Sequence, residues 1–183
     1  MTKTEEINQI VRERSLNQWH LLIASLLGSL GQKSSNQGAL NLLMARSMDD
    51  FIIPFYHGQP DFDEMKAQVS NAKDFPAEME IVVDYVNRLF SLAGTMKTTP
   101  GDNRNEAVVS IKSGSCRYCP VGVGKAKIDT NSTFCPIPTM IEKSINFFRD
   151  EKPPVKLHLH RDGAFTRVLI KKDGNCQITY KSS

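Results

Sequence analysis

The sequence of 183 residues lacks both a long apolar run and a strong charge of one sign. Its longest apolar stretch, Leu21 to Leu27, contains Ser25 and is far shorter than the about 20 residues that cross a membrane. The first residues, 1–6, contain no apolar segment typical of a signal peptide. A net charge of +3, spread along the chain, is too small to indicate a nucleic-acid binder. We therefore expect a cytoplasmic protein without a membrane span and without a nucleic-acid partner.

Several catalytic and cofactor patterns are also missing. The sequence has no recognisable Ser-His-Asp order, HExxH motif, paired-carboxylate motif or nicotinamide or flavin fingerprint. Gly122 and Gly124 lack the Lys-Ser/Thr that completes a phosphate-binding loop. A binding protein is therefore expected rather than an enzyme. Solvated helix positions are expected for the acidic residues Asp49, Asp50, Glu78 and Glu80.

Length and composition predict a single domain over residues 1–183. With 40% apolar residues, a chain of this length can bury a core without disulfides. The spacing of apolar residues changes near Pro100 and Gly101, from three or four residues to alternation. Residues 1–100 are thus expected to be mainly helical. Residues 101–183 are expected to hold a strand, a cysteine loop, a helix and a meander.

Three helices and a shorter one are predicted in the first part. The first begins at Ser15 as N-cap, and a second is expected to stop at Pro54. A short helix is expected within 60–72, and Asp74 caps a third long helix. The apolar stripe of the first helix consists of Leu16, Trp19, Ile23, Leu26, Leu27 and Leu30.

Strands dominate the second part. An alternating strand over 107–111 leads into the cysteines, and Pro136 opens a short helix. Tight turns at Asp162-Gly163 and Asp173-Gly174 separate three further strands and imply an antiparallel meander. The sequence therefore predicts an α+β fold, with N-terminal helices packed on a small antiparallel sheet that ends in a three-stranded meander. The three further strands are expected at 155–160, 165–170 and 176–180.

Three of the four cysteines lie within 20 residues of one another. Cys116 and Cys119 form a CxxC pair, a spacing that allows two thiolates to face one metal ion. Cys135 follows at an interval found in structural zinc sites, although without a second CxxC. In a reducing compartment, cysteines are free, catalytic or metal-bound more often than disulfide-linked. These residues therefore predict a metal site or a redox-sensitive site.

The alternation of the last strands bears on a fourth ligand. Cys176 shares a strand face with Ile178 and Tyr180, so it is expected to face the core, either as a small apolar residue or as a ligand. His158 and His160 are expected as an exposed pair, and they remain alternatives to Cys176, as does an open position for water. The predicted metal ligands are Cys116, Cys119, Cys135 and Cys176.

The cysteines leave the chemistry of the site open. As the predicted N-cap of a helix, Cys135 is expected to have a lowered thiol pKa. Zinc is possible. Haem is less expected, although two Cys-Pro pairs suggest it. An iron–sulfur cluster is also less expected, because the compact ferredoxin spacings are absent. In a thioredoxin-like redox pair the CxxC would begin a helix, whereas here a glycine-containing run follows.

The order of elements resembles a known family. Helices with a glycine-containing loop near 28–38 precede a long helix, a strand and a cysteine segment that leads into a helix. The chain then closes on Asp173-Gly-Asn-Cys176-Gln-Ile-Thr-Tyr180. This order resembles the 4-vinyl-reductase or hydrocarbon-binding domain family, which is related in fold to the TRAPP vesicle-transport subunits.

The resemblance implies a small-molecule-binding domain, commonly a homodimer, with an apolar pocket between helices and sheet. It also implies that cysteines bind zinc near that pocket. We therefore expect a ligand-binding or sensory domain for an apolar or tetrapyrrole-like molecule, with a cysteine-based metal or redox site. The alternatives are a reductase or accessory protein of tetrapyrrole metabolism, and an iron–sulfur or thiol redox protein.

Overall fold

The computed structural model describes residues 2–33, 37–119, 122–123, 135–150, 152, 155–158, 169–170 and 175–183. The helices are α1 (Lys3–Arg14), α2 (Gln18–Lys33), α3 (Gln37–Ser47), a π-helix (Met48–Ile52), α4 (Ile53–His57), α5 (Phe62–Ser70), α6 (Phe75–Phe90), a 3-10 turn (Ser113–Ser115) and α7 (Ile137–Phe148). The strands are β1 (Met96–Pro100), β2 (Glu106–Lys112), β3 (Val155–His158), β4 (Leu169–Ile170) and β5 (Asn175–Ser182).

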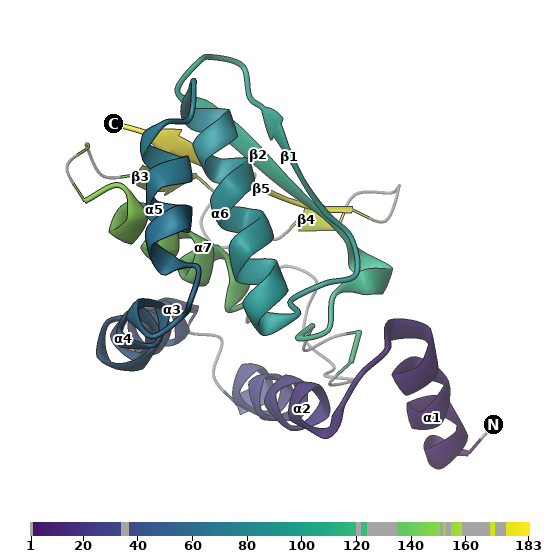
Figure 1. Cartoon of the computed structure of the whole chain (residues 1–183). Helices are drawn as coiled ribbons and strands as arrows, with labels where there is room; N and C mark the ends of the chain where they lie inside the picture. Colours follow the sequence, from purple (N-terminus) through teal and green to yellow (C-terminus); the bar gives the residue numbers. More distant parts are fainter. Residues whose placement is uncertain are drawn as a thin grey trace.

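Helices cover one face of an antiparallel sheet, which confirms the predicted α+β fold. Figure 1 shows α5 and α6 in front of the sheet with α7 beside them, whereas α1 to α4 follow one end of this layer. Helix α1 projects away from the sheet at the N-terminal end of the chain (Figure 1). None of the helices in the described ranges has the length and apolarity needed to cross a membrane.

The chain begins with a helix that the sequence analysis did not predict. Thr2 and Glu5 form a reciprocal capping box at its start. Ser15 ends this helix in the left-handed conformation, with φ of 51°, so the N-cap expected at Ser15 is wrong. The next helix is capped by Asn17 instead, whose Oδ1 accepts hydrogen bonds from the backbone N–H groups of Trp19 and His20, each at 3.0 Å.

Pro54 does not stop the second predicted helix. The chain continues through the π-helix into α4, where Pro54 occupies the first turn. Proline is tolerated there because first-turn N–H groups have no partner within the helix. This continuation brings Tyr56 into the core, where its side chain is fully buried.

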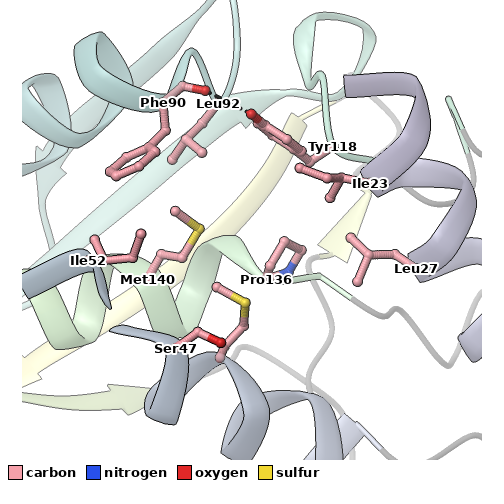
Figure 2. Close-up of a pocket in the computed structure, with 10 residues that line it drawn as sticks. Ile23, Leu27, Ser47, Ile52, Phe90, Leu92, Tyr118, Pro136 and Met140 are labelled. Carbon is pink, nitrogen blue, oxygen red and sulfur yellow. Dashed lines mark hydrogen bonds between the residues drawn. The ribbon is translucent and has the colours of Figure 1, made fainter. Parts of the chain in front are cut away.

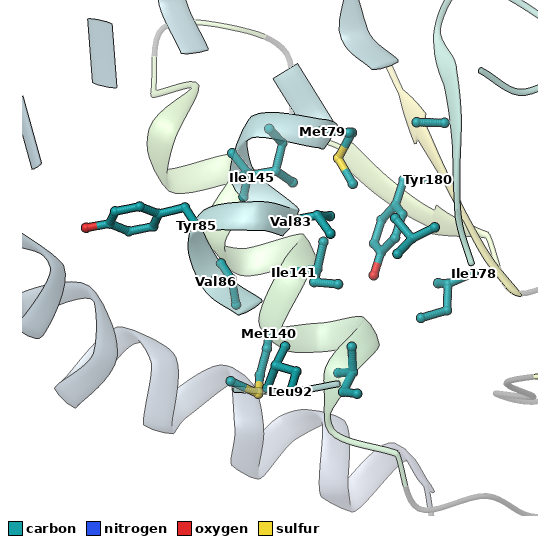
Figure 3. Packing of buried hydrophobic residues seen from close by; sticks show 14 of the residues in the cluster. Met79, Val83, Tyr85, Val86, Leu92, Met140, Ile141, Ile145, Ile178 and Tyr180 are labelled. Carbon is teal, nitrogen blue, oxygen red and sulfur yellow. The ribbon is translucent and has the colours of Figure 1, made fainter. Parts of the chain in front are cut away.

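Helix α6 follows its prediction. Asp74 Oδ1 accepts a hydrogen bond of 2.9 Å from the backbone N–H of Ala77, which confirms the expected cap. Its buried apolar residues turn toward α7 and the sheet, as Figure 3 shows for Met79, Val83 and Val86. Helix α5 also lies within its predicted range of 60–72.

Strand β5 holds the sheet together. The strand order is β1-β2-β5-β3, and β4 also pairs with β5, so β3 and β4 lie along the same edge of β5. All of these pairings are antiparallel. The predicted strand 107–111 lies within β2, whereas β1 falls in the part expected to be helical. The turns expected at 162–163 and 173–174 lie outside the described residues.

The core fills the space between α6, α7 and the sheet (Figure 3). Cys176, Ile178 and Tyr180 are all buried on β5, as their alternation predicted. The Tyr180 hydroxyl donates a hydrogen bond of 3.1 Å to the Pro138 carbonyl in the first turn of α7. This bond connects the strand that carries Cys176 to the helix that follows Cys135.

Candidate functional site

Three segments of the chain position the four cysteines. Cys116 follows β2 and the 3-10 turn, and it pairs as an isolated β-bridge with Ala93, just beyond α6. Cys119 is half-buried in the next turn. Cys135 lies two residues before α7, and Cys176 is on β5 directly opposite Ile111 of β2. All four remain thiols rather than disulfides.

The fold brings these four thiols together. Burial, together with the weaker effects of the charges of Cys119 and Cys176, raises the pKa of Cys116 to about 12. The pKa of Cys135 is raised well above its usual value. Burial is the main cause, and the charge of Cys116 and, more weakly, the charges of Cys119 and Cys176 act in the same direction. Burial also raises the pKa of Cys176 to about 12, with Cys119 next. The charges of the other three thiols act on Cys135, and the charge of Cys119 acts on Cys116 and Cys176, so the four thiols lie in one neighbourhood.

Backbone N–H groups are directed at three of the sulfur atoms. The N–H of Gly122 donates to Cys119 Sγ at 3.2 Å. A backbone hydrogen bond from Tyr118 favours the thiolate of Cys116, and one from Ile137 favours that of Cys135. Such N–H donors stabilise negative charge on sulfur. The segments around the cysteines are therefore built to support thiolates, although burial keeps the thiols protonated.

Cys135 differs from its prediction in two ways. The N-cap of α7 is Pro136, one residue later than expected. The thiol pKa is raised rather than lowered, because burial outweighs the hydrogen bond from Ile137. The predicted low thiol pKa is therefore wrong.

In the described ranges, no three His, Cys, Asp or Glu side chains are placed so that they could hold a metal ion as they stand. The cysteines are neighbours, but their side chains do not surround a common point. Of the alternative ligands, His158 lies on β3 with its side chain outside the described atoms, and His160 lies outside the described residues.

An apolar cavity of about 230 Å³ adjoins the cysteine cluster. Figure 2 shows Ile23 and Leu27 of α2 on one side and Met140 of α7 on another. The lining residues are Ile23, Leu27, Met44, Ser47, Ile52, Phe90, Leu92, Tyr118, Pro136 and Met140. Among the described lining residues, the polar side chains are those of Ser47 and Tyr118, and the Tyr118 hydroxyl donates to the Phe90 carbonyl at 3.0 Å. This lining suits an uncharged apolar molecule.

Two lining residues belong to the cysteine segments. Tyr118 lies between Cys116 and Cys119, and Pro136 directly follows Cys135. The cavity and the thiol cluster therefore share parts of the same backbone.

The family resemblance implied an apolar pocket near the cysteines, but sequence reasoning identified neither its lining residues nor the arginines beside the thiols. Arg14 Nη1 donates a hydrogen bond of 2.7 Å to the Cys116 carbonyl oxygen. Its charge acts to lower the pKa of both Cys116 and Cys176. Arg117 Nε donates to the Arg14 carbonyl at 3.1 Å. The lone signal for Arg117 was its position inside the CxxC pair, and nothing in the sequence places Arg14 near it.

The fold and this site define an α+β domain with an apolar cavity next to a four-cysteine cluster. The chain belongs to the MJ0207 family, whose family model matches residues 62–182. The match includes all four cysteines and the elements from α5 to β5, and it leaves α1 to α4 outside. Comparisons with curated proteins and with solved structures gave no match.

Proposed function

We propose that this chain is a ligand-binding or sensory domain, in which Cys116, Cys119, Cys135 and Cys176 hold one zinc ion beside a pocket for a small apolar molecule. The observation that carries the proposal is the sharing of backbone between the two sites. Tyr118 and Pro136 line the cavity and are each bonded directly to a cysteine of the cluster.

Zinc is the metal that best fits this donor set. Four thiolates form a closed tetrahedral zinc site, in which the ion has a structural role. The N–H groups directed at Cys116, Cys119 and Cys135 supply outer hydrogen bonds of the kind that orient metal ligands. Because the thiols must lose their protons and rotate toward one ion, the site forms when the metal binds.

The cavity favours a ligand smaller than a tetrapyrrole. Its volume of about 230 Å³ lies below the ~300–1,000 Å³ typical of pockets for drug-sized ligands. No charged side chain is found among the lining residues that the structure describes. A single aromatic ring or a short hydrocarbon chain fits these properties. The resemblance to hydrocarbon-binding domains agrees with this class of ligand, whereas a tetrapyrrole would require the helices to move apart.

Metal content and colour test the cysteine site. We expect protein purified without oxygen to contain one zinc per chain and to be colourless. Brown colour would instead favour an iron–sulfur cluster, and a Soret band would favour haem. Each Cys→Ser change should reduce zinc content, whereas Ile178→Val, a buried change on the same strand face as Cys176, should not. Absence of metal together with a disulfide that forms readily between Cys116 and Cys119 would contradict the proposal.

The pocket can be tested with N-phenyl-1-naphthylamine, an uncharged apolar dye whose fluorescence rises in apolar surroundings. We expect binding to the zinc-loaded protein, and Ile52→Trp should abolish it because Ile52 lines the cavity. Phe51→Trp is the matched control, since the neighbouring Phe51 is 71% exposed. Equal binding by both variants would place the dye elsewhere and contradict the pocket.

We also propose that the protein is a homodimer. Helix α2 exposes a face without charges, on which Trp19 is 61% and Leu26 is 54% exposed. The neighbouring helices add Leu42, Leu43, Phe51 and Phe55 to the exposed apolar side chains. Homodimer interfaces are more apolar than interfaces between transient partners. Leu26→Glu should therefore halve the mass measured by light scattering, whereas Lys97→Glu on β1 should leave it unchanged. A monomeric wild-type protein would contradict this proposal.

A further inference from the structure

The N-terminal helices are attached to the rest of the protein through the cysteine segment. Helix α1 has no buried residue. Its last residue is anchored by two hydrogen bonds, from Arg14 Nη1 to the Cys116 carbonyl at 2.7 Å and from Arg117 Nε to the Arg14 carbonyl at 3.1 Å. The Arg14 guanidinium also lies against Gly122, where an added Cβ would meet Nη2 at 2.8 Å.

A small apolar cluster reinforces this attachment. Val123 is buried with Leu16 and Ala24, which lie at the end of the α1–α2 turn and in α2. Ile10, Val11, Leu21 and Cys119 pack around them. Val123 is itself held by a hydrogen bond of 2.8 Å from its N–H to the Cys119 carbonyl. Val123 therefore provides part of the surface on which α1 and α2 pack.

Helix α2 connects the cysteine segment to the cavity. His20 packs edge-on against the Tyr118 ring, with centroids 5.1 Å apart. One and two helical turns further along, Ile23 and Leu27 form the α2 wall of the cavity (Figure 2). A shift of α2 at His20 would therefore move the Ile23 and Leu27 side chains relative to Met140 on the opposite side.

Metal binding changes the charge that Arg14 faces. Binding of Zn²⁺ requires four thiolates, so the loaded cluster has a net charge of roughly −2. A guanidinium beside this charge is attracted to it, and partial burial strengthens the attraction. Arg14 thus interacts more favourably with the loaded state than with neutral thiols. Such a difference in interaction is what a conformational equilibrium needs in order to shift.

We infer that zinc at the cysteine cluster controls the docking of α1 and α2, and that this docking sets the affinity of the apolar cavity for its ligand. The inference rests on the proposed zinc site. It makes the metal a regulator of the pocket, with Arg14 and Val123 as the positioning residues that link the two.

Hydrogen exchange of the full chain tests the docking. Zinc content is measured first, so that failure of the metal site is separated from failure of the inference. With zinc bound, backbone amides of residues 3–33 should exchange more slowly than after chelation, by about 5-fold or more at typical coupling energies. Amides of α6 serve as the internal standard for global unfolding. One zinc per chain with equal exchange in both states would overturn the inference and leave the zinc site intact.

Charge variants test the link through Arg14. Arg14→Gln keeps a hydrogen-bond donor but removes the charge, so the zinc-dependent protection of 3–33 should be lost while zinc content in excess metal is kept. Arg12→Gln is the matched control, because Arg12 is an exposed residue in the same last turn. Equal protection in the two variants would overturn the role of Arg14.

Dye affinity tests whether the docking of α1 and α2 affects the pocket. N-phenyl-1-naphthylamine should bind the zinc-loaded wild-type protein about 5-fold or more tightly than the chelated protein, within the usual range of coupling between sites. In Arg14→Gln the two affinities should converge. Equal affinity of loaded and chelated wild-type protein would overturn control of the pocket by the metal.

Discussion

The carboxylate of Glu78 lies 2.7 Å from Arg149 Nε, and the two side chains are each 7% exposed. Arg149 also donates to the Ser182 hydroxyl with both Nη atoms, each at 3.0 Å. Lys152 Nζ donates to the other Glu78 oxygen at 2.6 Å. This buried network connects the first turn of α6 to the end of α7 and to the last residues of β5. The solvated position expected for Glu78 is therefore wrong.

Breaking this network should destabilise the protein strongly. Glu78→Gln leaves the buried Arg149 without its counter-charge, and loss of one partner of a buried pair costs about 3–5 kcal/mol. Urea unfolding should show this loss in the free energy of unfolding. Glu78→Gln combined with Arg149→Met should recover part of the stability, because the buried guanidinium is removed and the remaining charge, on Lys152, is partly exposed to water. Equal stability of the wild-type protein and Glu78→Gln would show that the pair contributes nothing.

A second prediction concerns the hydroxyl of Tyr56, which is 2.8 Å from Ser144 Oγ. Ser144 Oγ donates to the Met140 carbonyl at 2.7 Å, so Tyr56 donates to Ser144. Tyr56→Phe removes this bond and should lower the free energy of unfolding by about 0.5–1.5 kcal/mol at pH 7. Gln59→Glu, which lies outside the core, should have a smaller effect. A larger loss of unfolding free energy in Gln59→Glu than in Tyr56→Phe would contradict the contribution of the Tyr56–Ser144 hydrogen bond.

The same tyrosine predicts an alkaline transition. Burial raises the pKa of Tyr56 from 10.0 to about 12. Between these values the unfolded chain ionises while the folded chain stays neutral, so stability present below pH 10 is lost as pH rises toward 12. Unfolding measured across this range should show a shallower decline in Tyr56→Phe. An unchanged slope would contradict the contribution of Tyr56.

At acid pH, Glu142 should oppose folding less. Burial raises the pKa of this half-buried carboxyl, and the charge of Lys143 only partly offsets the effect. Above the raised pKa, the ionised form is less favourable in the folded state than in the unfolded chain. Glu142→Gln should therefore stabilise the protein at pH 7, and the gain should vanish as pH falls below the unfolded pKa. A gain that persists at low pH would have another cause.

The sequence predicted elements whose stability comes from local signals. Helix α6 has a capping aspartate, an early proline and apolar residues on one face, and each can be read from neighbouring positions. Helix α1 was missed because its apolar stripe is short, consisting of Ile7, Ile10 and Val11, although its Thr2 to Glu5 capping box was readable. Strand β1 was missed because its residues, MKTTP, do not alternate between apolar and polar. Glu78 was misplaced because its partner Arg149 is distant in sequence.

In the candidate site, too, some features follow from local sequence signals and others depend on the whole fold. Alternation alone placed Cys176 on the buried face of its strand. The raised pKa of Cys135 depends on burial by the whole fold, which outweighs the local hydrogen bond from Ile137. The cavity joins α2, α6 and α7, and its lining depends on how those helices pack. Arg14 and Cys116 are 102 residues apart in the sequence, so no local pattern encodes their contact.

The final prediction is that zinc raises the thermal stability of the protein. A ligand that binds only the folded state at 100 times its dissociation constant stabilises that state by about 2.7 kcal/mol. The unfolding midpoint, measured with a reducing agent, should therefore rise with free zinc concentration. Cys176→Ser should lose this dependence because it removes a sulfur from β5, whereas Glu142→Gln should retain it. The same midpoint in chelated and zinc-saturated wild-type protein would contradict the four-cysteine zinc site.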